Sequence, residues 1–261
     1  MSEVTLITFP PSLDSELSRF LLQHYDIEHR EERHTLYFCF AATLARGLTI
    51  LFPLLSSDSY RLSRVREIVD HFDPLSPPKK RLLPPDPARA KAEEDWPLFN
   101  DTLAFATAIF AYYHLLPHKP IMVRPLSEGA PAYEVRAVQK AYPLFSGLLR
   151  LLLRLTASRA REALATAERV LSTVDERIAD GRPYLLGDCF SLSDMAFAVA
   201  AAPLVLPDGY GGPLPTFDQM PDVMQAAIRA TRQRPAGQFA LRIYREHRTD
   251  SEAAPRKAVG T

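Results

Sequence analysis

Apolar residues form a short, nearly continuous run near the start of the chain, over residues 4–9. Such a run is typical of a strand that is buried on both faces, and two prolines end it. Over residues 12–25 the apolar side chains recur at three- and four-residue steps, which predicts an amphipathic helix. Ser12 stands where the N-cap of that helix is expected. The chain is therefore predicted to open with a strand followed by a helix.

The next elements continue this alternation. Residues 27–34 are polar, which predicts a strand at the edge of a sheet. Residues 48–55 are mostly apolar and predict another strand, although Pro53 interrupts it. Residues 62–72 carry apolar side chains with the period of a helix. The order of strands and helices indicates a small α/β domain with crossover connections.

A proline-rich segment, residues 77–87, divides the chain. Proline fixes the backbone and lacks an N–H donor, so this segment is predicted to be a linker rather than a helix or a central strand. It separates an N-terminal domain of residues 1–76 from a C-terminal domain of residues 88–248, where every strong signal has the period of a helix. The tail, residues 249–261, has no apolar period and is predicted to be disordered.

Charge and composition narrow the class of protein. The 31 basic residues balance 31 acidic ones, which argues against a surface built mainly to bind nucleic acid, although a local basic patch stays open. The arginines within residues 150–161 are most simply a solvated face. The 2 cysteines cannot form a disulfide scaffold. The start of the chain lacks the pattern of a secretory signal, and no apolar run reaches the roughly 20 residues of a membrane span. We therefore expect a soluble, cytoplasmic protein with no membrane partner.

Two motifs in the C-terminal half carry a family resemblance. Residues 182–188 read RPYLLGD and are followed by FSLSDMA, in which Ser191 and Asp194 have the spacing of a capping box. Residues 234–240 read RPAGQFA. Together with the predicted domain order, these motifs resemble the glutathione transferase superfamily. The resemblance implies a thioredoxin-like N-terminal domain, an all-helical C-terminal domain and a two-fold homodimer.

The resemblance also implies a glutathione site at the start of the first helix. Backbone N–H groups and the helix dipole there favour a thiolate. Ser12 occupies the place of the catalytic residue, where its hydroxyl would donate to the glutathione thiolate, and Ser15 is the second choice. A plain N-cap serine explains Ser12 equally well.

Two other glutathione positions differ from the family pattern. Where the family has a cis-proline, the alignment places Leu51, preceded by Ile50. A cis bond without proline costs about 2.5–4 kcal/mol, so Leu51 is expected to be trans. Arg64 and Val65 stand where relatives have an acidic residue and a serine that hold the γ-glutamyl group. We therefore predict that glutathione binds weakly or not at all.

Aromatic residues gather in the helix that relatives use to bind an apolar substrate. The residues predicted to line this hydrophobic pocket are Phe105, Tyr112, Tyr113 and His114. The alternative is that these aromatic side chains only pack between helices and line no pocket. His114 and His118 have the spacing of metal ligands, but Pro117 lies between them, so we expect no metal.

Three functions remain open on the sequence. The first is a transferase-like enzyme that conjugates or isomerises a bulky hydrophobic molecule, with Ser12 polarising the thiol. The second is a binding protein that keeps the fold and holds an apolar ligand or a protein partner. The third is a biosynthetic enzyme that acts without glutathione. The residues Leu51, Arg64 and Val65 favour the second function, whereas most members of the family are enzymes, so we predict the first, with an atypical glutathione site.

Overall fold

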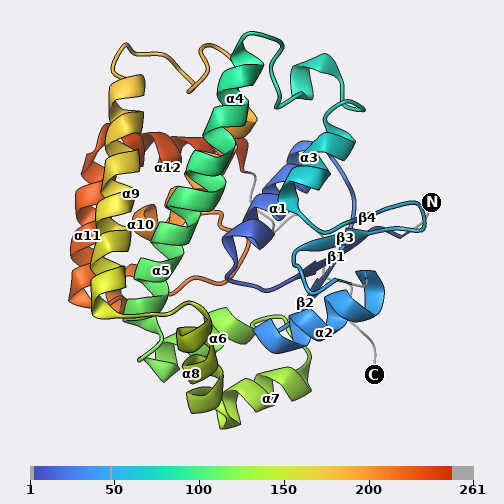
Figure 1. Cartoon of the computed structure of the whole chain (residues 1–261), viewed down its shortest axis with the longest axis vertical. Helices are drawn as coiled ribbons and strands as arrows, with labels where there is room; N and C mark the ends of the chain where they lie inside the picture. Colours follow the sequence, from blue (N-terminus) through green and yellow to red (C-terminus); the bar gives the residue numbers. More distant parts are fainter. Residues whose placement is uncertain (1–2, 48, 249–261) are drawn as a thin grey trace.

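The computed structural model describes residues 3–47 and 49–248. A small four-stranded sheet with its own helices forms one part of the molecule, and a larger group of helices forms the other (Figure 1). This architecture confirms the predicted α/β fold followed by an all-helical part. The predicted disordered tail, residues 249–261, lies outside the described residues.

The sheet has the strand order β2-β1-β3-β4. β1 (Thr5–Thr8) pairs parallel with β2 (Arg30–Arg33) and antiparallel with β3 (Leu54–Ser56), which in turn pairs antiparallel with β4 (Arg61–Leu62). β1 is buried along its length, as its apolar sequence predicts. β2 lies at the edge of the sheet, where its charged side chains remain partly hydrated.

Helices cover both faces of this sheet. α1 (Leu13–His24) and α3 (Val65–Phe72) lie on one face, and α2 (Leu36–Gly47) lies on the other (Figure 1). α1 and α3 follow the predicted helical stripes. α2 is not predicted by the sequence pattern, because its residues are mostly apolar and leave no polar stripe to mark a period.

The predicted strand over residues 48–55 is much shorter in the structure. β3 begins only at Leu54, whose partner across the sheet is Ile7. Pro53 stands directly before it and has no N–H to donate, and residues 49–52 form a loop. β4 is too short to leave a pattern in the sequence.

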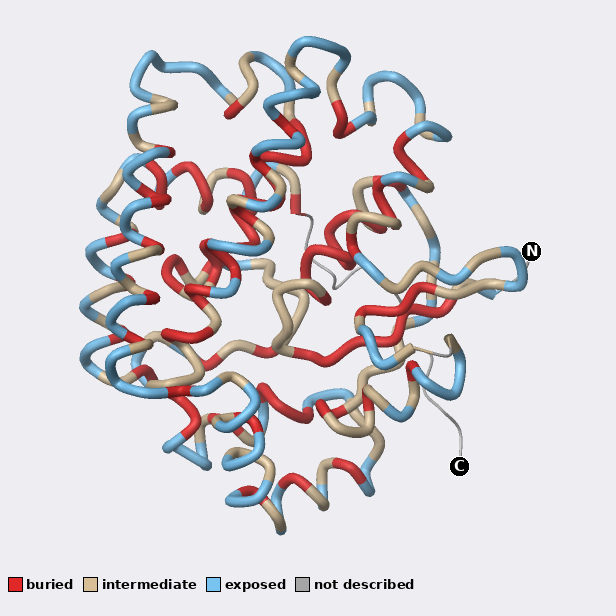
Figure 2. The backbone as a smooth tube through the Cα atoms, viewed as in Figure 1, coloured by how far each residue is buried: buried red, intermediate tan, exposed pale blue. Residues whose placement is uncertain are grey.

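The helical part is built on one buried helix. Every residue of α10 (Leu192–Val205) except Pro203 is buried, and the other helices pack around it (Figure 2). The remaining helices are α4 (Ala88–Trp96), the π-helical turn η2 (Pro97–Leu103), α5 (Ala104–Leu115), α6 (Lys119–Ser127), α7 (Ala132–Lys140), α8 (Tyr142–Leu152), α9 (Ala157–Arg177), α11 (Asp222–Gln233) and α12 (Pro235–His247). None of the helices in the described ranges is both long and apolar enough to cross a bilayer.

The predicted capping box starts α10. Asp194 accepts hydrogen bonds from the N–H groups of Ser191 at 2.8 Å and Leu185 at 2.7 Å, and from the Ser191 hydroxyl at 2.6 Å. Burial of the carboxyl raises the pKa of Asp194 to about 6, although these hydrogen bonds act in the opposite direction. Asp194 therefore satisfies backbone groups that water cannot reach at the start of the central helix.

Candidate functional site

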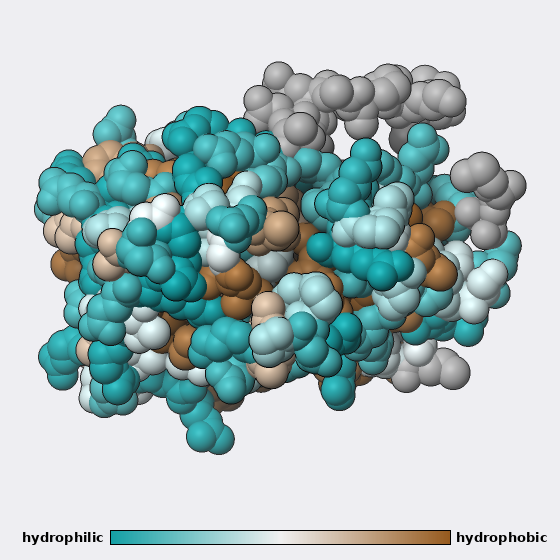
Figure 3. Space-filling view, turned by 90° about the horizontal axis from the view of Figure 1, so that it is seen from above, coloured by the Kyte–Doolittle hydropathy of each residue, from teal (hydrophilic) through white to brown (hydrophobic). Residues whose placement is uncertain are grey.

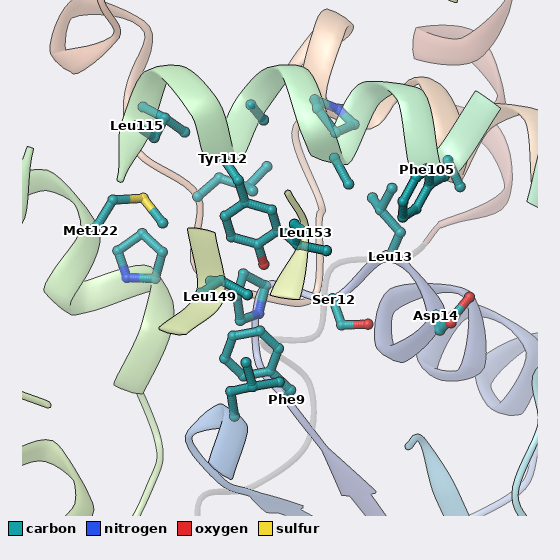
Figure 4. Close-up of a pocket in the computed structure, with 18 of the residues that line it drawn as sticks. Phe9, Ser12, Leu13, Asp14, Phe105, Tyr112, Leu115, Met122, Leu149 and Leu153 are labelled. Atoms are coloured by element: carbon teal, nitrogen blue, oxygen red, sulfur yellow. The ribbon is translucent and has the colours of Figure 1, made fainter. Parts of the chain in front are cut away.

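A cavity of about 510 Å³ lies between the sheet and the helical part. This volume is within the range of small-molecule sites, which often lie between domains. Figure 4 shows the cavity beneath α5, with the turn between β1 and α1 on the opposite side. Its apolar lining includes Phe9, Pro11, Leu13, Leu36, Phe40, Phe52, Ala108, Leu115, Met122, Leu149, Leu153 and Pro213. The site can therefore bury an apolar molecule.

One face of α5 forms the roof of the cavity. Phe105 and Tyr112 line it, and Tyr112 points its hydroxyl away from α5 toward the side of Phe9 (Figure 4). Tyr113 and His114 lie on other faces of the helix, since neighbouring residues of a helix point in different directions. His114 packs on Phe110, with ring centroids 4.8 Å apart. Of the four predicted pocket residues, the structure thus brings two to the cavity and leaves two out.

Ser12 lies at the edge of the cavity, at the N-cap of α1. Its Oγ accepts the N–H of Ser15 at 3.4 Å. Ser15 itself is buried outside the cavity lining, and its hydroxyl has no partner within the described residues. Ser12, which the sequence analysis prefers to Ser15 as the catalytic residue, is therefore the serine that a ligand in the cavity can approach.

Ile50 and Leu51, which the sequence analysis aligned with the family's proline position, lie in the loop ahead of β3 and do not line the cavity. The cis peptide bond of this segment joins Phe52 and Pro53, directly before β3, whereas Ile50 and Leu51 are 61% and 43% exposed. The register of β3 against β1 fixes which residue stands at the start of the strand, and a sequence pattern alone carries no such information. Phe52 lines the cavity, with its ring 5.9 Å from that of Phe9.

Arg64 and Val65 lie at the start of α3, where the sequence alignment places them. Arg64 is exposed, Val65 is buried, and neither lines the cavity. The carboxylate of Glu67 accepts the backbone N–H groups of Ser63 at 2.7 Å and Arg64 at 3.3 Å. Glu67 therefore caps the start of α3, and neither residue 64 nor residue 65 has a side-chain oxygen.

Two carboxylates that the sequence analysis missed, Asp14 and Asp101, are the only charged side chains among the described residues of the lining. Asp14 is in the first turn of α1, and Asp101 is in the π-helical turn η2 that begins at Pro97. Burial, together with repulsion from Asp101, raises the pKa of Asp14 to about 6. The cavity therefore carries negative charge at its edge and no cation to balance it.

A buried ionic cluster holds the loop that follows α10 against the cavity. We define the Glu16 cluster as Glu16, Arg19, Glu31 and Arg248. Glu16 accepts the N–H of Gly211 at 2.8 Å, and Arg19 donates to the carbonyl of Pro10 at 3.3 Å. Because the loop carries Tyr210 and Pro213 and Pro10 precedes Ser12, the cluster fixes two walls of the cavity.

Tyr210 brings an unsatisfied polar group to this wall. Its hydroxyl is buried and has no hydrogen-bond partner within the described residues, although most buried polar atoms in proteins have one. Burial raises the pKa of Tyr210 well above its usual value, so the hydroxyl stays protonated. No group of three or more His, Cys, Asp or Glu side chains in residues 3–47 and 49–248 is arranged to hold a metal ion.

Comparison with known proteins agrees with this architecture. Residues 156–229 match the family model described as the C-terminal domain of glutathione S-transferase. This match and the fold of the chain support membership of the glutathione S-transferase superfamily. A glutathione S-transferase from Sinorhizobium meliloti 1021 is 18% identical with a TM-score of 0.54, over 98% of this chain and 97% of that one. No curated protein matches the chain in sequence.

Two further solved structures resemble this chain in fold over most of their length. A glutathione S-transferase from Rhodospirillum rubrum F11 has a TM-score of 0.57 at 15% identity, over 91% of each chain. FzlA from C. crescentus has a TM-score of 0.52 at 20% identity, over 92% of each chain. At such low identity, these structures support the fold alone.

The residues that the family resemblance singles out lie at the starts of α1, β3 and α3. Ser12 caps α1 at the edge of the cavity, and Pro53 directly precedes β3. Arg64 and Val65, which the resemblance aligns with the residues that hold the γ-glutamyl part of glutathione, stand at the start of α3. A buried valine has no polar side-chain atom and an arginine repels an ammonium, so neither side chain offers an acceptor for an amine.

Proposed function

We propose that this glutathione S-transferase superfamily protein takes up a bulky apolar small molecule in the cavity between the sheet and α5. The observation that carries the proposal is the cavity itself, which is about 510 Å³ in volume and lined mainly by apolar side chains. A few convergent polar groups interrupt that lining, as in typical ligand sites. They are Ser12, Tyr112 and Tyr210 together with the acidic pair.

The charge of the cavity narrows the class of ligand. Asp14 and Asp101 repel an anion, and no cation among the described lining residues offsets them. An uncharged molecule is tolerated, and a molecule with a protonated amine gains an ionic contact. The buried hydroxyl of Tyr210 can make a hydrogen bond that the free protein lacks. The favoured ligand is therefore apolar, uncharged or cationic.

Transfer of glutathione to such a molecule is the second candidate. The observation in its favour is Ser12 at the start of α1 on the cavity edge, where a hydroxyl could donate to a thiolate. Glutathione carries a net negative charge, and Arg64 and Val65 offer no grip on its γ-glutamyl end. Charge-assisted hydrogen bonds contribute about 1.5–3 kcal/mol each, so losing two of them weakens binding at least a hundredfold.

A dye titration with a cavity-filling variant tests the proposal. Ala108 lines the cavity on α5, so Ala108→Trp is expected to fill it and to abolish binding of an uncharged hydrophobic dye. Ala230→Trp places the same ring on an exposed position of α11 and should leave binding unchanged. Equal dye binding by Ala108→Trp and the original chain would contradict the proposed site.

Calorimetry with reduced glutathione separates the two candidates. We expect weak or undetectable binding to the original chain. Micromolar binding that Ser12→Ala abolishes would instead support a glutathione-dependent enzyme.

A further inference from the structure

Helix α8 presents an apolar face to solvent. Leu144, Leu148, Leu151 and Leu152 are 61%, 43%, 73% and 60% exposed, and they recur at helical steps. Gly147 lies among them, and a side chain built there would meet nothing within 4 Å. We call these five residues the α8 face. Within the described residues it holds no polar side chain, which is unusual for the surface of a protein.

Other parts of the surface differ from this face. On the face of the molecule shown in Figure 3, hydrophilic side chains predominate and apolar ones form small, scattered groups. α8 lies at the opposite end of the molecule, beside α6 and α7 (Figure 1). Four exposed leucines are thus gathered on one helix, whereas Leu44, Leu51 and Leu75 are exposed singly elsewhere.

The segment of chain that contains the α8 face is rich in cations and poor in acids. Between Glu128 and Glu162 the only acidic residue is Glu134, which is buried and bonded to His34 and Thr35. The basic residues of the same segment form no ion pair within the described residues. They are Arg136, Lys140, Arg150, Arg154, Arg159 and Arg161. The segment therefore carries an unbalanced positive charge although the whole chain is neutral.

We infer that the α8 face docks on the surface of an anionic lipid bilayer. Exposed leucines enter the boundary between headgroups and acyl chains, while the flanking arginines and lysine meet acidic headgroups. This interaction needs no helix that crosses the membrane.

Two other occupants explain the surface less well. A second copy of the chain would bring two unbalanced sets of cations face to face, which opposes association. A nucleic acid would pair with the cations but would leave the leucines exposed. An anionic lipid surface satisfies the apolar face and the cations together.

The position of the α8 face also connects it to the cavity. Leu152 is exposed on this face and lines the cavity at the same time, next to Leu149 and Leu153. Docking would therefore place one wall of the cavity at the lipid surface. The inference does not depend on the proposed ligand, because the test below measures vesicle binding alone.

Cosedimentation with vesicles tests the inference. We expect the full chain to bind vesicles of phosphatidylcholine mixed with phosphatidylglycerol, not to bind phosphatidylcholine alone, and to dissociate as salt is raised. Leu144→Ser, Leu148→Ser and Leu151→Ser should each weaken binding by about tenfold. Charge reversals Arg136→Glu and Lys140→Glu should each weaken it by about fivefold or more.

Matched controls lie on the linker side of the molecule. Leu75 is 73% exposed, as is Leu151, and Lys79 is an exposed cation. Leu75→Ser and Lys79→Glu should leave vesicle binding unchanged, and thermal unfolding checks that every variant is folded. Absent or equal binding to both kinds of vesicle would overturn the inference. So would a dimer that Leu148→Ser dissociates, or oligonucleotide binding that the leucine variants retain in place of vesicle binding.

Discussion

Replacing Glu16 by glutamine should destabilise the protein far more than breaking an ion pair on the surface. The Glu16 side chain is fully buried, and its carboxylate accepts from the Nε of Arg248 at 3.1 Å and from the N–H of Gly211 at 2.8 Å. Arg19 lies 3.5 Å away on the same carboxylate and is also buried. Glu16→Gln keeps the size of the side chain but leaves two buried guanidinium groups with less negative charge.

The expected cost follows from the burial of these charges. Breaking a buried pair by removing one partner costs about 3–5 kcal/mol, because the remaining charge has lost its water and its counter-charge. For a chain of this size, that cost corresponds to a fall in Tm of roughly 6–20 °C. The loop at Gly211 loses one anchor as well, so dye binding in the cavity should weaken along with stability.

Chemical and thermal unfolding with a matched control measure this effect. Glu93→Gln breaks the contact with Arg66 at 2.6 Å, but these side chains are 42% and 23% exposed. Surface pairs contribute at most about 1 kcal/mol, so this control should change stability little. If Glu16→Gln and Glu93→Gln shift the free energy of unfolding by similar small amounts, the Glu16 cluster does not hold the cavity wall as described.

Four further predictions concern other parts of the molecule. Asp194→Ala should lower the free energy of unfolding at pH 7 by about 2–4 kcal/mol, because buried N–H groups of Leu185 and Ser191 lose their acceptor. The folded-state pKa of Asp194 is raised from 3.8 to about 6, so the original chain should lose stability relative to Asp194→Asn as pH rises from 4 to 6, measured by denaturant unfolding. Asp14 has a pKa of about 6, so a cationic dye should bind about tenfold more tightly at pH 7 than at pH 5, and Asp14→Asn should remove that dependence. Sedimentation velocity at micromolar concentration should show a homodimer, twice the 29.3 kDa of one chain, and a monomer alone would contradict the expected assembly.

The elements that the sequence predicts correctly are those with local signals. α1 has Ser12 at its N-cap and a clear apolar stripe, and α10 begins with the Ser191–Asp194 capping box. α2 lacks a polar stripe, and Pro125 within α6 resembles a helix breaker, so neither helix is evident from the pattern. Local periodicity thus finds helices that are half exposed and misses those whose neighbours decide their conformation.

The candidate site depends on contacts that no short pattern encodes. Ser12, Phe105 and Tyr112 are found because a helix start and an aromatic helix can be recognised from sequence. Asp14 and Asp101 lie far apart in the sequence and meet at the cavity only in the folded chain. β3 begins only at Leu54, which leaves Ile50 and Leu51 outside the cavity lining, and the direction of each side chain on α5 leaves Tyr113 and His114 outside it as well.

A crystal structure of the protein with a bound uncharged hydrophobic dye tests the central claim most directly. Ligand density between Phe52, Tyr112 and Leu153, the side chains that surround the cavity, is the predicted result. A dye bound at any other place, with these three side chains closed over an unfilled cavity, would contradict the proposal that this site takes up an apolar molecule.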